Sequence, residues 1–534
     1  MLASCPTNAE LANFGLPMED ELLAVIDLGT NTFNLVVVAL RGEFYQVLDK
    51  VKEPVKLGEG GLAAGRLSDA AWDRGLAALH KFRRLIDSRG CTQTLAFATS
   101  AIRSAANGAD FCQQVLAETG ILIQVINGNQ EAALIYEGIK YGLSLPLNEH
   151  VLMVDIGGGS VEFIVANRMG AQLLRSVNVG AARLWEAVQP ADPLTEGQQQ
   201  AVIEVLDREL AGLVAEIREF GVRTLIGSSG TYETIGALSA YEDNEKFLLD
   251  NLNGYRVEVR KFRKIHRRLL ASRREERLAW RGLDPMRVDL ILLGSLLTQY
   301  LVDRLPIEQL VVSMFALKDG IVVQHLRERR TLGPAPDPTT RSQRETGVRE
   351  LAAKFRCNPD KGDYVARLVL SLFDQTRYLH RFGTQEREWL QYACLLLDVG
   401  HLVNRSGHHK HGQYIIQNCG LPGFSGKELL LISNLVRYHR KSLPSDEHFY
   451  FNMLYKEDKH VVEVLAGLLR LGLNLNRAER RLITDLVLRP NGLRSMSLGL
   501  SALQPPDVEL QAAEQEKALF ERAFGVELSF ELLA

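Results

Sequence analysis

The chain has 534 residues, 46% of them hydrophobic and 24% charged, and its formal net charge is −3. These values are typical of a folded protein of several domains, and they exclude a disordered chain and a small disulfide-stapled scaffold. Because Lys+Arg 62 nearly balance Asp+Glu 65, a polyanion would have to be bound by local clusters of basic residues. No stretch reaches the roughly 18 apolar residues of a membrane span. The six cysteines form no CxxC pair, so we expect a reducing, cytoplasmic environment.

Short apolar, β-branched runs alternate with longer stretches of helical periodicity from residue 22 to about residue 323, which is the pattern of α/β domains. After residue 331 the sequence has three prolines and no apolar periodicity, which predicts a linker. From Gly347 to about Leu488 the periodicity indicates an all-helical domain. The predicted strands are Leu22–Asp27, Leu35–Leu40, Thr94–Ala98, Ile121–Ile126, Val151–Asp155 and Val161–Ala166.

The predicted domain division follows from these changes in pattern. It comprises an N-terminal extension (1–21), a first α/β lobe (22–144), a second α/β lobe (145–330), a linker (331–346), a helical domain (347–500) and a small C-terminal unit (501–534).

One internal similarity organises the first half of the chain. Residues 27–37, DLGTNTFNLVV, align with residues 155–165, DIGGGSVEFIV, at a spacing of 128 residues. In each segment an apolar run ends in an aspartate, a glycine-containing turn with a hydroxyl residue follows, and a second apolar run leaves. Two related lobes that face each other across a cleft are the simplest interpretation.

The glycine-containing turns are suited to phosphate. Glycines allow backbone N–H groups to approach an anion, Ser160 adds a donor, and Asp155 could hold a divalent cation. One such turn could equally be a plain hairpin. A third turn, Gly227–Thr231, follows another apolar run, and the three turns together favour phosphate binding.

Glu131 stands in the first turn of a predicted helix, just after the strand that ends at Ile126. A carboxylate there commonly does no more than interact favourably with the helix dipole. Its position between the two matched turns in chain order makes a general-base role the alternative. Thr99, Ser100 and Arg103 follow another predicted strand, and the Arg103 guanidinium could either bind phosphate oxygens or cap a surface helix.

Taken in order, the motifs DLGTNTFNLVV, LGEGG, FATSAIRSAANG, INGNQEA, DIGGGSVEF and GSSGT resemble the exopolyphosphatase and guanosine pentaphosphate phosphohydrolase family. The segments LLLDVGHLVNRSGHHKHGQYIIQNCGLPGF and LVRYHRK resemble the C-terminal domain of its long members. This resemblance implies an α/β fold with two actin-like, ribonuclease-H-like lobes around a cleft, then an all-α domain, and it implies a homodimer.

The resemblance also implies an activity: release of terminal orthophosphate from inorganic polyphosphate, or of the 5′ γ-phosphate from guanosine pentaphosphate, with Mg²⁺. Glu131 matches the carboxylate that activates water. Asp155, Glu162 and Asp27 are the predicted magnesium ligands. From the motifs and the resemblance together, the predicted phosphate-binding residues are Asp27, Gly29, Asn31, Thr32, Thr99, Ser100, Arg103, Gly157, Gly158, Gly159, Ser160, Gly227, Ser228, Ser229, Gly230 and Thr231.

The sequence departs from the family pattern at two places beside these residues. Gln130 stands where a second acid often precedes the general base, and Val161 replaces a common threonine. Neither position carries a residue assigned to the chemistry, but both affect how water and metal are positioned.

The helical half contains Asp398 with several histidines around it. In metal-dependent phosphohydrolases of the His-Asp class the aspartate follows a histidine ligand, but here Leu397 precedes it, which disfavours a metal centre. Basic residues favour a groove for a long polyanion, with a solvated basic face as the alternative. The predicted groove residues are Arg405, His408, Lys410, His411, Arg437, Arg440 and Lys441.

The leading hypothesis is thus a processive exopolyphosphatase, and the nearest alternative is the same chemistry on guanosine pentaphosphate. An ATP-dependent kinase is disfavoured because Glu131 would activate water, and a nonhydrolytic polyphosphate or alarmone sensor is a further alternative. The basic run RKFRKIHRR at 260–268 is predicted to be a solvated helix face, and no nucleic-acid-binding motif accompanies it.

Overall fold

The computed structural model describes residues 21–41, 44–61, 64–243, 251–331, 343–492 and 494–533. The chain divides into two compact units, Met1–Asp337 and Pro338–Ala534. The predicted N-terminal extension, apart from Glu21, and most of the predicted linker lie outside the described residues. Within the described ranges, no helix combines the length and the apolar character that crossing a bilayer would require.

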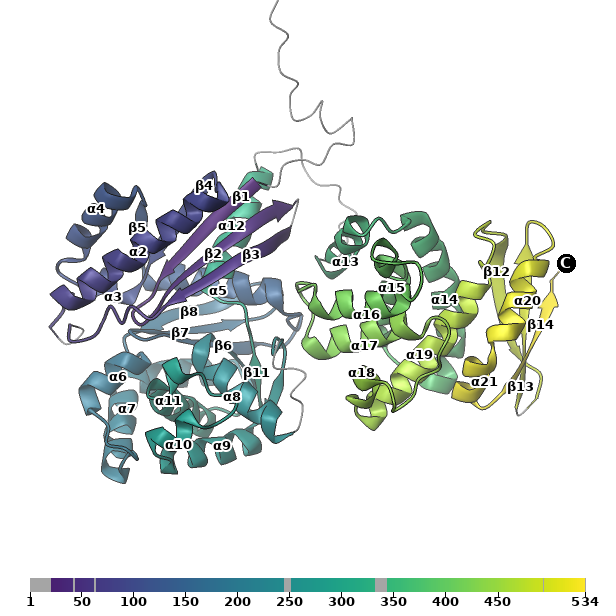
Figure 1. The fold of residues 1–534 in the computed structure, drawn as a ribbon. Helices are drawn as coiled ribbons and strands as arrows, with labels where there is room; N and C mark the ends of the chain where they lie inside the picture. Colours follow the sequence, from purple (N-terminus) through teal and green to yellow (C-terminus); the bar gives the residue numbers. More distant parts are fainter. Residues whose placement is uncertain are drawn as a thin grey trace, which may run out of the picture. The chain divides into compact units, whose positions relative to one another are not determined.

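The first sheet of the N-terminal unit, called sheet A here, has the strand order β3-β2-β1-β4-β5 (Figure 1). Strand β1 pairs antiparallel with β2 and parallel with β4. Its alternate residues face two different cores, with Ala24 and Ile26 on one side and Leu23 and Val25 on the other. The elements are β1 (Glu21–Leu28), β2 (Phe33–Arg41), β3 (Phe44–Glu53), α2 (Asp69–Arg89), β4 (Gln93–Ala98), α3 (Ser100–Ser104), α4 (Gly108–Thr119) and β5 (Ile123–Val125).

The second sheet, sheet B, has the order β10-β11-β9-β6-β7-β8. Apart from the edge strand β10, this order repeats that of sheet A, and β6 again pairs antiparallel with the next strand and parallel with the strand on its other side. The elements are β6 (Val151–Ile156), β7 (Val161–Ala166), β8 (Ala171–Val177), α6 (Ala181–Val188), α7 (Glu196–Arg218), β9 (Thr224–Ser228), α8 (Ser229–Glu242), β10 (Arg256–Glu258), α9 (Val259–Ala271), α10 (Arg274–Leu278), η2 (Pro285–Arg287), α11 (Leu290–Arg304) and β11 (Gln309–Val312).

The repeated strand order confirms the predicted actin-like α/β fold class. All six predicted strands are present. Strands β3 and β8 were not predicted, because charged and polar residues interrupt their apolar pattern, as in FYQVLDKVKE and AQLLRSV. The basic run falls on α9, where Phe262, Ile265 and Leu269 are buried between exposed arginines.

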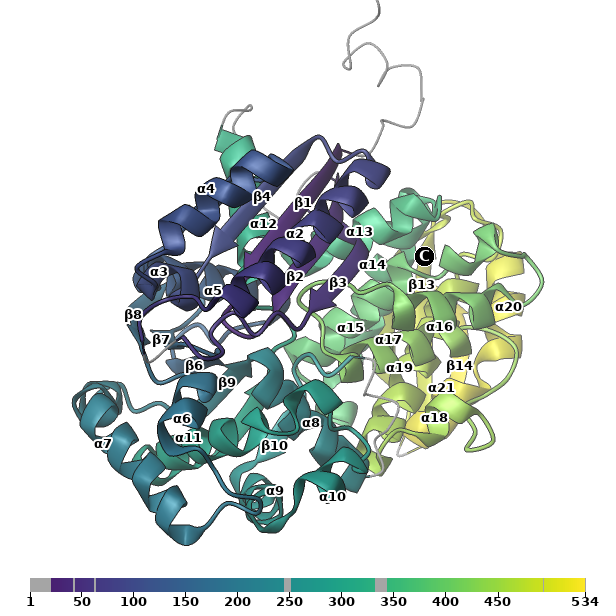
Figure 2. The same cartoon turned by 60° about the vertical axis from the view of Figure 1, so that its left-hand side comes forward.

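Two helices join the sheets. Helix α5 (Gly128–Gly142) follows β5 of sheet A but packs against β7 and β8 of sheet B, whereas α12 (Leu317–Thr331) follows β11 of sheet B and packs against β1 of sheet A. The two helices also pack against each other, within one hydrophobic cluster that includes residues of both sheets. The exchange can be followed by turning from Figure 1 to Figure 2. It brings Glu131, at the start of α5, to a cavity that Asp27 of β1 and Asp155 of β6 also line.

The C-terminal unit begins as a bundle of helices, as the apolar periodicity predicted. A three-stranded sheet in the order β12-β13-β14 follows the bundle, and β12 and β13 fall largely in residues that were expected to be helical. The elements are α13 (Gln343–Lys354), α14 (Pro359–His380), α15 (Thr384–Leu395), η3 (Val399–Leu402), α16 (His408–Asn418), α17 (Gly426–Tyr438), α18 (Phe449–Asn452), α19 (Lys456–Asn474), β12 (Ile483–Pro490), β13 (Ser495–Ala502), α20 (Asp507–Glu516), α21 (Ala518–Phe524) and β14 (Glu527–Leu532).

Candidate active site

The two aligned segments form two hairpins with the same turn. In the β1–β2 hairpin the Gly29 N–H donates to the Thr32 carbonyl at 3.1 Å, and in the β6–β7 hairpin the Gly157 N–H donates to the Ser160 carbonyl at 3.0 Å. The register is also the same, since Asp27 pairs with Asn34 and Asp155 pairs with Glu162. The chain therefore presents the same backbone turn twice, each time next to an aspartate, of which Asp27 is half-buried and Asp155 is buried.

The tips of the two hairpins approach each other closely. A Cβ atom placed on Gly158 would lie 3.1 Å from the Cβ of Thr30, and one placed on Gly159 would lie 2.6 Å from the hydroxyl oxygens of Ser100 and Thr30. Glycine in the second hairpin thus makes room for the side chains of the first. This packing requirement is additional to the close approach of an anion that the sequence suggested.

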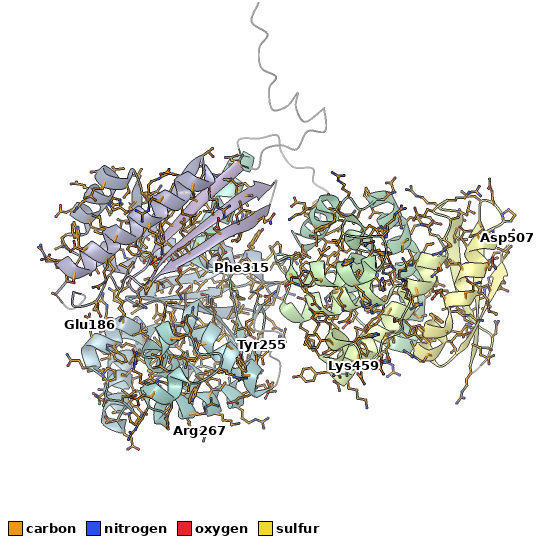
Figure 3. The ribbon with its side chains drawn as sticks, in the orientation of Figure 1. Glu186, Tyr255, Arg267, Phe315, Lys459 and Asp507 are labelled. Atoms are coloured by element: carbon orange, nitrogen blue, oxygen red, sulfur yellow. The ribbon has the colours of Figure 1, made fainter. Side chains whose placement is uncertain are left out.

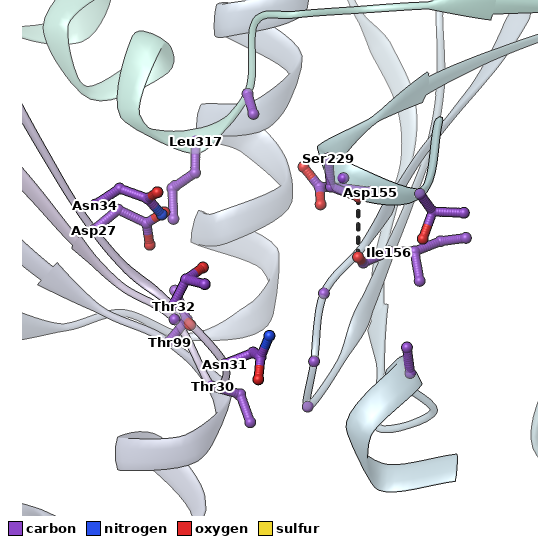
Figure 4. A pocket seen from close by; sticks show the side chains of 18 of the residues that line it. Asp27, Thr30, Asn31, Thr32, Asn34, Thr99, Asp155, Ile156, Ser229 and Leu317 are labelled. Carbon is purple, nitrogen blue, oxygen red and sulfur yellow. Dashed lines mark hydrogen bonds between the residues drawn. The ribbon is translucent and has the colours of Figure 1, made fainter. Parts of the chain in front are cut away.

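The hairpins border a cavity of about 240 Å³. Figure 4 shows Asp27, Asn34 and Thr32 on one side of the cavity and Asp155 and Ser229 on the other. Sixteen of the predicted site residues line it: Asp27, Gly29, Asn31, Thr32, Thr99, Ser100, Glu131, Asp155, Gly157, Gly158, Gly159, Ser160, Glu162, Ser229, Gly230 and Thr231.

Asp155 and Glu162 each use one carboxylate oxygen in hydrogen bonds. Ser228 donates to Asp155 Oδ2 at 2.7 Å, and Ser160 and Ser176 donate to Glu162 Oε1 at 2.7 and 2.8 Å. Burial raises the pKa of both acids, and repulsion from Glu131 and Asp155 raises the pKa of Glu162 further. Two buried acids that pair across one hairpin, with serines orienting them, are hard oxygen donors of the kind that Mg²⁺ prefers.

Asp27 in the first hairpin has a different environment. Asn34 donates to Asp27 Oδ2 at 3.1 Å. Burial raises the pKa of Asp27 to about 6, although the nearby Lys318 ammonium and the Asn34 hydrogen bond lower it. The first hairpin therefore holds one acid, balanced by a lysine, where the second hairpin holds two.

Glu131 lies at the start of α5, which a capping box fixes. The Asn127 side chain accepts the Gln130 N–H, and Gln130 Oε1 accepts the Asn127 N–H, both at 2.9 Å. Arg103 Nη1 donates to Glu131 Oε2 and to the Ile126 carbonyl, again at 2.9 Å in each case. Gln130, which stands where a second acid was expected, therefore caps the helix and holds the neighbouring Glu131 in place.

Burial raises the pKa of Glu131 to about 7, with a further increase from Asp27 and Asp155, against the lowering effect of Arg103. Glu131 Oε1 makes no hydrogen bond to the described residues, and the residue lines the cavity. A buried carboxylate with one fixed oxygen, one free oxygen and a pKa near neutrality has the properties of a general base.

The third predicted turn is a strand-to-helix junction. β9 continues to Ser228, and α8 begins at Ser229, whose φ is 73°. The side chain of Ser229 donates to the Ile156 carbonyl at 3.0 Å, as drawn in Figure 4. Backbone N–H groups at the start of a helix suit an anion. This element is therefore a helix start and not the predicted turn, but it offers the same kind of phosphate-binding donors.

Three of the predicted phosphate-binding residues do not line the cavity. Gly227 is inside β9 against the ring of Tyr232, and Ser228 is bound to Asp155. Arg103 lines a second, more open cavity together with Asn127, Asn129 and Gln130. The Arg103 guanidinium thus contacts Glu131 from outside the first cavity.

Several lining residues were missed by the sequence analysis. Lys52 lies on the unpredicted strand β3, and Lys318 lies in the first turn of α12. Arg287 donates to the Gly230 carbonyl and to Glu233 Oε2, both at 2.8 Å, and so holds the start of α8. Only Lys318 had a signal in the sequence, because it forms the charged pair Lys318–Asp319 shortly after the apolar run that ends at Val312.

At the edge of the N-terminal unit, a loop of the first lobe contacts the second. The Gly60 N–H, which belongs to the LGEGG motif, donates to Glu186 Oε1 of α6 at 3.1 Å. Figure 3 labels Glu186 on this side of the unit. The LGEGG motif therefore helps to hold the lobes together.

In the C-terminal unit, the predicted groove residues are a mixture of exposed and buried side chains. Arg405, Lys410 and Lys441 are exposed, whereas His408 and Arg437 are buried. Asp398, His401 and His408 have ligand atoms within 4.8 Å of one another. The Lys361 ammonium, however, lies 2.8 Å from Asp398 Oδ2 and already neutralises this carboxylate.

A duplicated α/β lobe whose matched hairpins border one acidic cavity defines an actin-like protein that binds phosphate groups. The model of the Ppx/GppA phosphatase family matches residues 36–329, and that of Ppx/GppA phosphatase domain III matches residues 343–494. The chain belongs to this family and is a phosphohydrolase.

Solved structures agree with this assignment. An exopolyphosphatase from Cytophaga hutchinsonii is 31% identical, with a TM-score of 0.56, and the match covers 57% of this chain and 98% of that one. An exopolyphosphatase-like protein is 26% identical, with a TM-score of 0.51, over 58% of this chain and 99% of that one.

Proposed function

We propose that this protein releases terminal orthophosphate from inorganic polyphosphate, with Glu131 as the general base. The observation that carries the proposal is the setting of Glu131, a buried acid with one oxygen bound to Arg103 and the other free beside two matched turns. The similarity to an exopolyphosphatase supports the choice of substrate.

Hydrolysis of a phosphoanhydride needs a positioned water molecule, a group that takes its proton, and neutralisation of the charge on the transferred phosphoryl group. Glu131 Oε1 would accept the proton from water, and Arg103 would keep the carboxylate in position. The backbone N–H groups of the hairpins and of the start of α8 would bind oxygens of the terminal phosphoryl group, with the hydroxyls of Thr32 and Thr231 as further donors.

The donor set fits a magnesium ion. Asp155 and Glu162 would hold it, with Asp27 as the third predicted ligand, and it would supply charge neutralisation at the phosphoryl oxygens. Asp155 Oδ1 and Glu162 Oε2 make no hydrogen bond to the residues that the structure describes, which supports this assignment. The raised pKa of both acids supports it too, since a bound cation would favour their ionised forms. Lys318 and Lys52 would add positive charge at the wall of the cavity.

The test is phosphate release in the presence of Mg²⁺ from long-chain polyphosphate and, separately, from guanosine pentaphosphate, measured with malachite green. We expect the higher kcat/KM with polyphosphate and almost no release by Glu131→Gln. Preference for guanosine pentaphosphate would assign the same chemistry to the nucleotide. Tight polyphosphate binding by the wild type with no release from either substrate would instead indicate a sensor.

A further inference from the structure

Three arginines are buried among the described residues: Arg277, Arg437 and Arg470, with relative exposures of 1%, 6% and 4%. Two of them are fully partnered. Arg277 donates to Asp192 Oδ1 and to the Val288 carbonyl, both at 3.0 Å. Arg470 is paired with Glu516 and donates to the carbonyls of residues 441 and 442. Such acceptors are what a guanidinium needs when it leaves water.

Arg437 is the exception. Among the described residues it has no carboxylate partner and no hydrogen bond, and its Nη1 atom is buried without an acceptor. Its nearest favourable contact is the ring of Tyr438, whose centroid lies 5.7 Å from the guanidinium carbon, at the limit of a cation–π interaction. A buried charge of this kind is costly, so its presence in α17 calls for an anion that the chain does not itself supply.

A second buried polar atom near Arg437 also lacks a partner. It is Nδ1 of His409, on helix α16, which packs against α17. Burial is the main cause of the lowered pKa of His409; among the charges Arg437 lowers it most, and Arg440 and Lys441 act in the same direction. Two unpartnered buried groups therefore lie in a region of positive potential.

The surrounding histidines are satisfied without a ligand. Arg440 Nη1 lies 3.2 Å from His408 Nδ1, His408 Nε2 lies 3.2 Å from His439 Nε2, and His439 Nδ1 lies 2.6 Å from the Val436 carbonyl. When Arg440 donates to His408 Nδ1, one set of protons makes each of these a donor–acceptor pair, although His408 Nδ1 then cannot also donate to the Arg405 carbonyl 3.1 Å away. Together with the Lys361 ammonium on Asp398, this chain of bonds disfavours a metal ion at the cluster.

Nearby carboxylates do not supply the missing charge. Asp398 is bound to Lys361, and Asp446 is bound to Lys459 at 2.6 Å. Lys410 and Lys441, by contrast, are exposed beside the cluster and have no ion pair among the described residues. Glu447 is exposed and also has no ion pair among the described residues, so the unpaired charges in this part of the unit are mainly, though not all, positive.

We propose that Arg437 and His409, with Arg440 and Lys441, form a binding site for one compact phosphoryl anion within the C-terminal unit. Guanidinium and imidazole donors suit phosphoryl oxygens. The inward position of the two unpartnered atoms favours a single phosphoryl group over a run of polymer along the surface. The anion is either free orthophosphate or the end of a polyphosphate chain, since both present the same oxygens. The proposal does not depend on the active site in the N-terminal unit.

The test uses the full chain carrying Glu131→Gln, so that no substrate is hydrolysed, in phosphate-free buffer. Hydrogen exchange of the α16 and α17 peptides is measured with orthophosphate, with long-chain polyphosphate and with no addition. We expect orthophosphate to slow exchange in these peptides, and the additional change Arg437→Met to abolish the effect. Arg377→Met removes an exposed arginine of the same unit and should retain it.

Thermal unfolding separates a ligand-binding role from a packing role. If Arg437 is kept for an anion, Arg437→Met should unfold at the same temperature as its parent or higher without phosphate. Phosphate should then raise the unfolding temperature of the parent by more than that of Arg437→Met, which keeps only the active site as a phosphate site. His409→Gln, a milder change, should weaken the phosphate effect while leaving the fold intact. An effect with polyphosphate alone would assign the site to the polymer end.

Two results would overturn the proposal. One is that neither anion changes exchange in α16 and α17 of the parent protein. The other is that Arg437→Met unfolds well below its parent in phosphate-free buffer while the response to phosphate persists. If the wild-type protein releases no phosphate from polyphosphate, the proposed function fails, but these binding measurements can still be made and interpreted.

Discussion

The β1–β2 and β6–β7 hairpins share a backbone and differ in their side chains. Both have the same turn hydrogen bond and the same aspartate at the end of the first strand. Opposite that aspartate, however, the first hairpin has the amide of Asn34 and the second has the carboxylate of Glu162. The two hairpins therefore share one backbone frame, and only the second places two carboxylates opposite each other.

The largest effect is expected from an acid that belongs to neither hairpin. Glu131→Gln should lower kcat for phosphate release by about 10²–10⁴-fold, the usual contribution of a general base, with binding of polyphosphate nearly unchanged. Glu137→Gln, on the same helix but outside the cavity, is the matched control. Full activity of Glu131→Gln would place the chemistry in the hairpins alone.

Exchanging the residues that distinguish the hairpins tests the comparison directly. Glu162→Gln should weaken activation by Mg²⁺ by more than the roughly 10–100-fold that loss of an outer-shell partner costs. Asn34→Asp, which gives the first hairpin the same kind of acid, should cause a smaller loss through repulsion of Asp27. Mg²⁺ titrations of phosphate release measure both, and equal losses would show that the hairpins are equivalent in function.

The raised pKa of Glu131 also affects how stability depends on pH. The pKa of Glu131 is about 7 in the folded protein against an ordinary 4.5, so its contribution to stability is complete below about pH 4.5 and is lost as the pH rises through 7. Without Mg²⁺, raising the pH from 5 to 8 should therefore destabilise the wild type relative to Glu131→Gln by on the order of 3 kcal/mol. Urea unfolding at the two pH values measures this, and parallel curves would contradict it.

A smaller effect is expected at the hairpin tips. Gly159→Ala places a Cβ atom against Ser100 and Thr30 and should destabilise the protein by about 1–2 kcal/mol, with a raised KM, because the tips must separate. Gly170→Ala, in the next hairpin, meets no atom within 4 Å and should be nearly neutral. Equal unfolding midpoints for the two variants would show that the tips are loosely packed.

Particular residues show how far the sequence could reach. The motif around Asp155 indicated both the hairpin and its chemistry, since these depend on neighbouring residues. Gln130 was seen as a departure from the family pattern, but its capping role needs the helix start to be known. The junction at Ser229 was interpreted as a turn, because a strand that runs directly into a helix has no distinct local pattern.

By itself the sequence determined six strands of the two lobes, the repeat at 128 residues, the family and about half of the residues around the cavity. Only the tertiary structure shows that Arg103 contacts Glu131 from outside the first cavity and that Lys52, Arg287 and Lys318 line that cavity with the acids. It also shows that Arg437 is buried with no hydrogen-bond partner among the described residues. The physical reason is how far apart along the chain the interacting residues lie. Hairpins and helix starts are set by residues a few positions apart, whereas the charge balance of a site is set by side chains that only the packing of distant elements brings together.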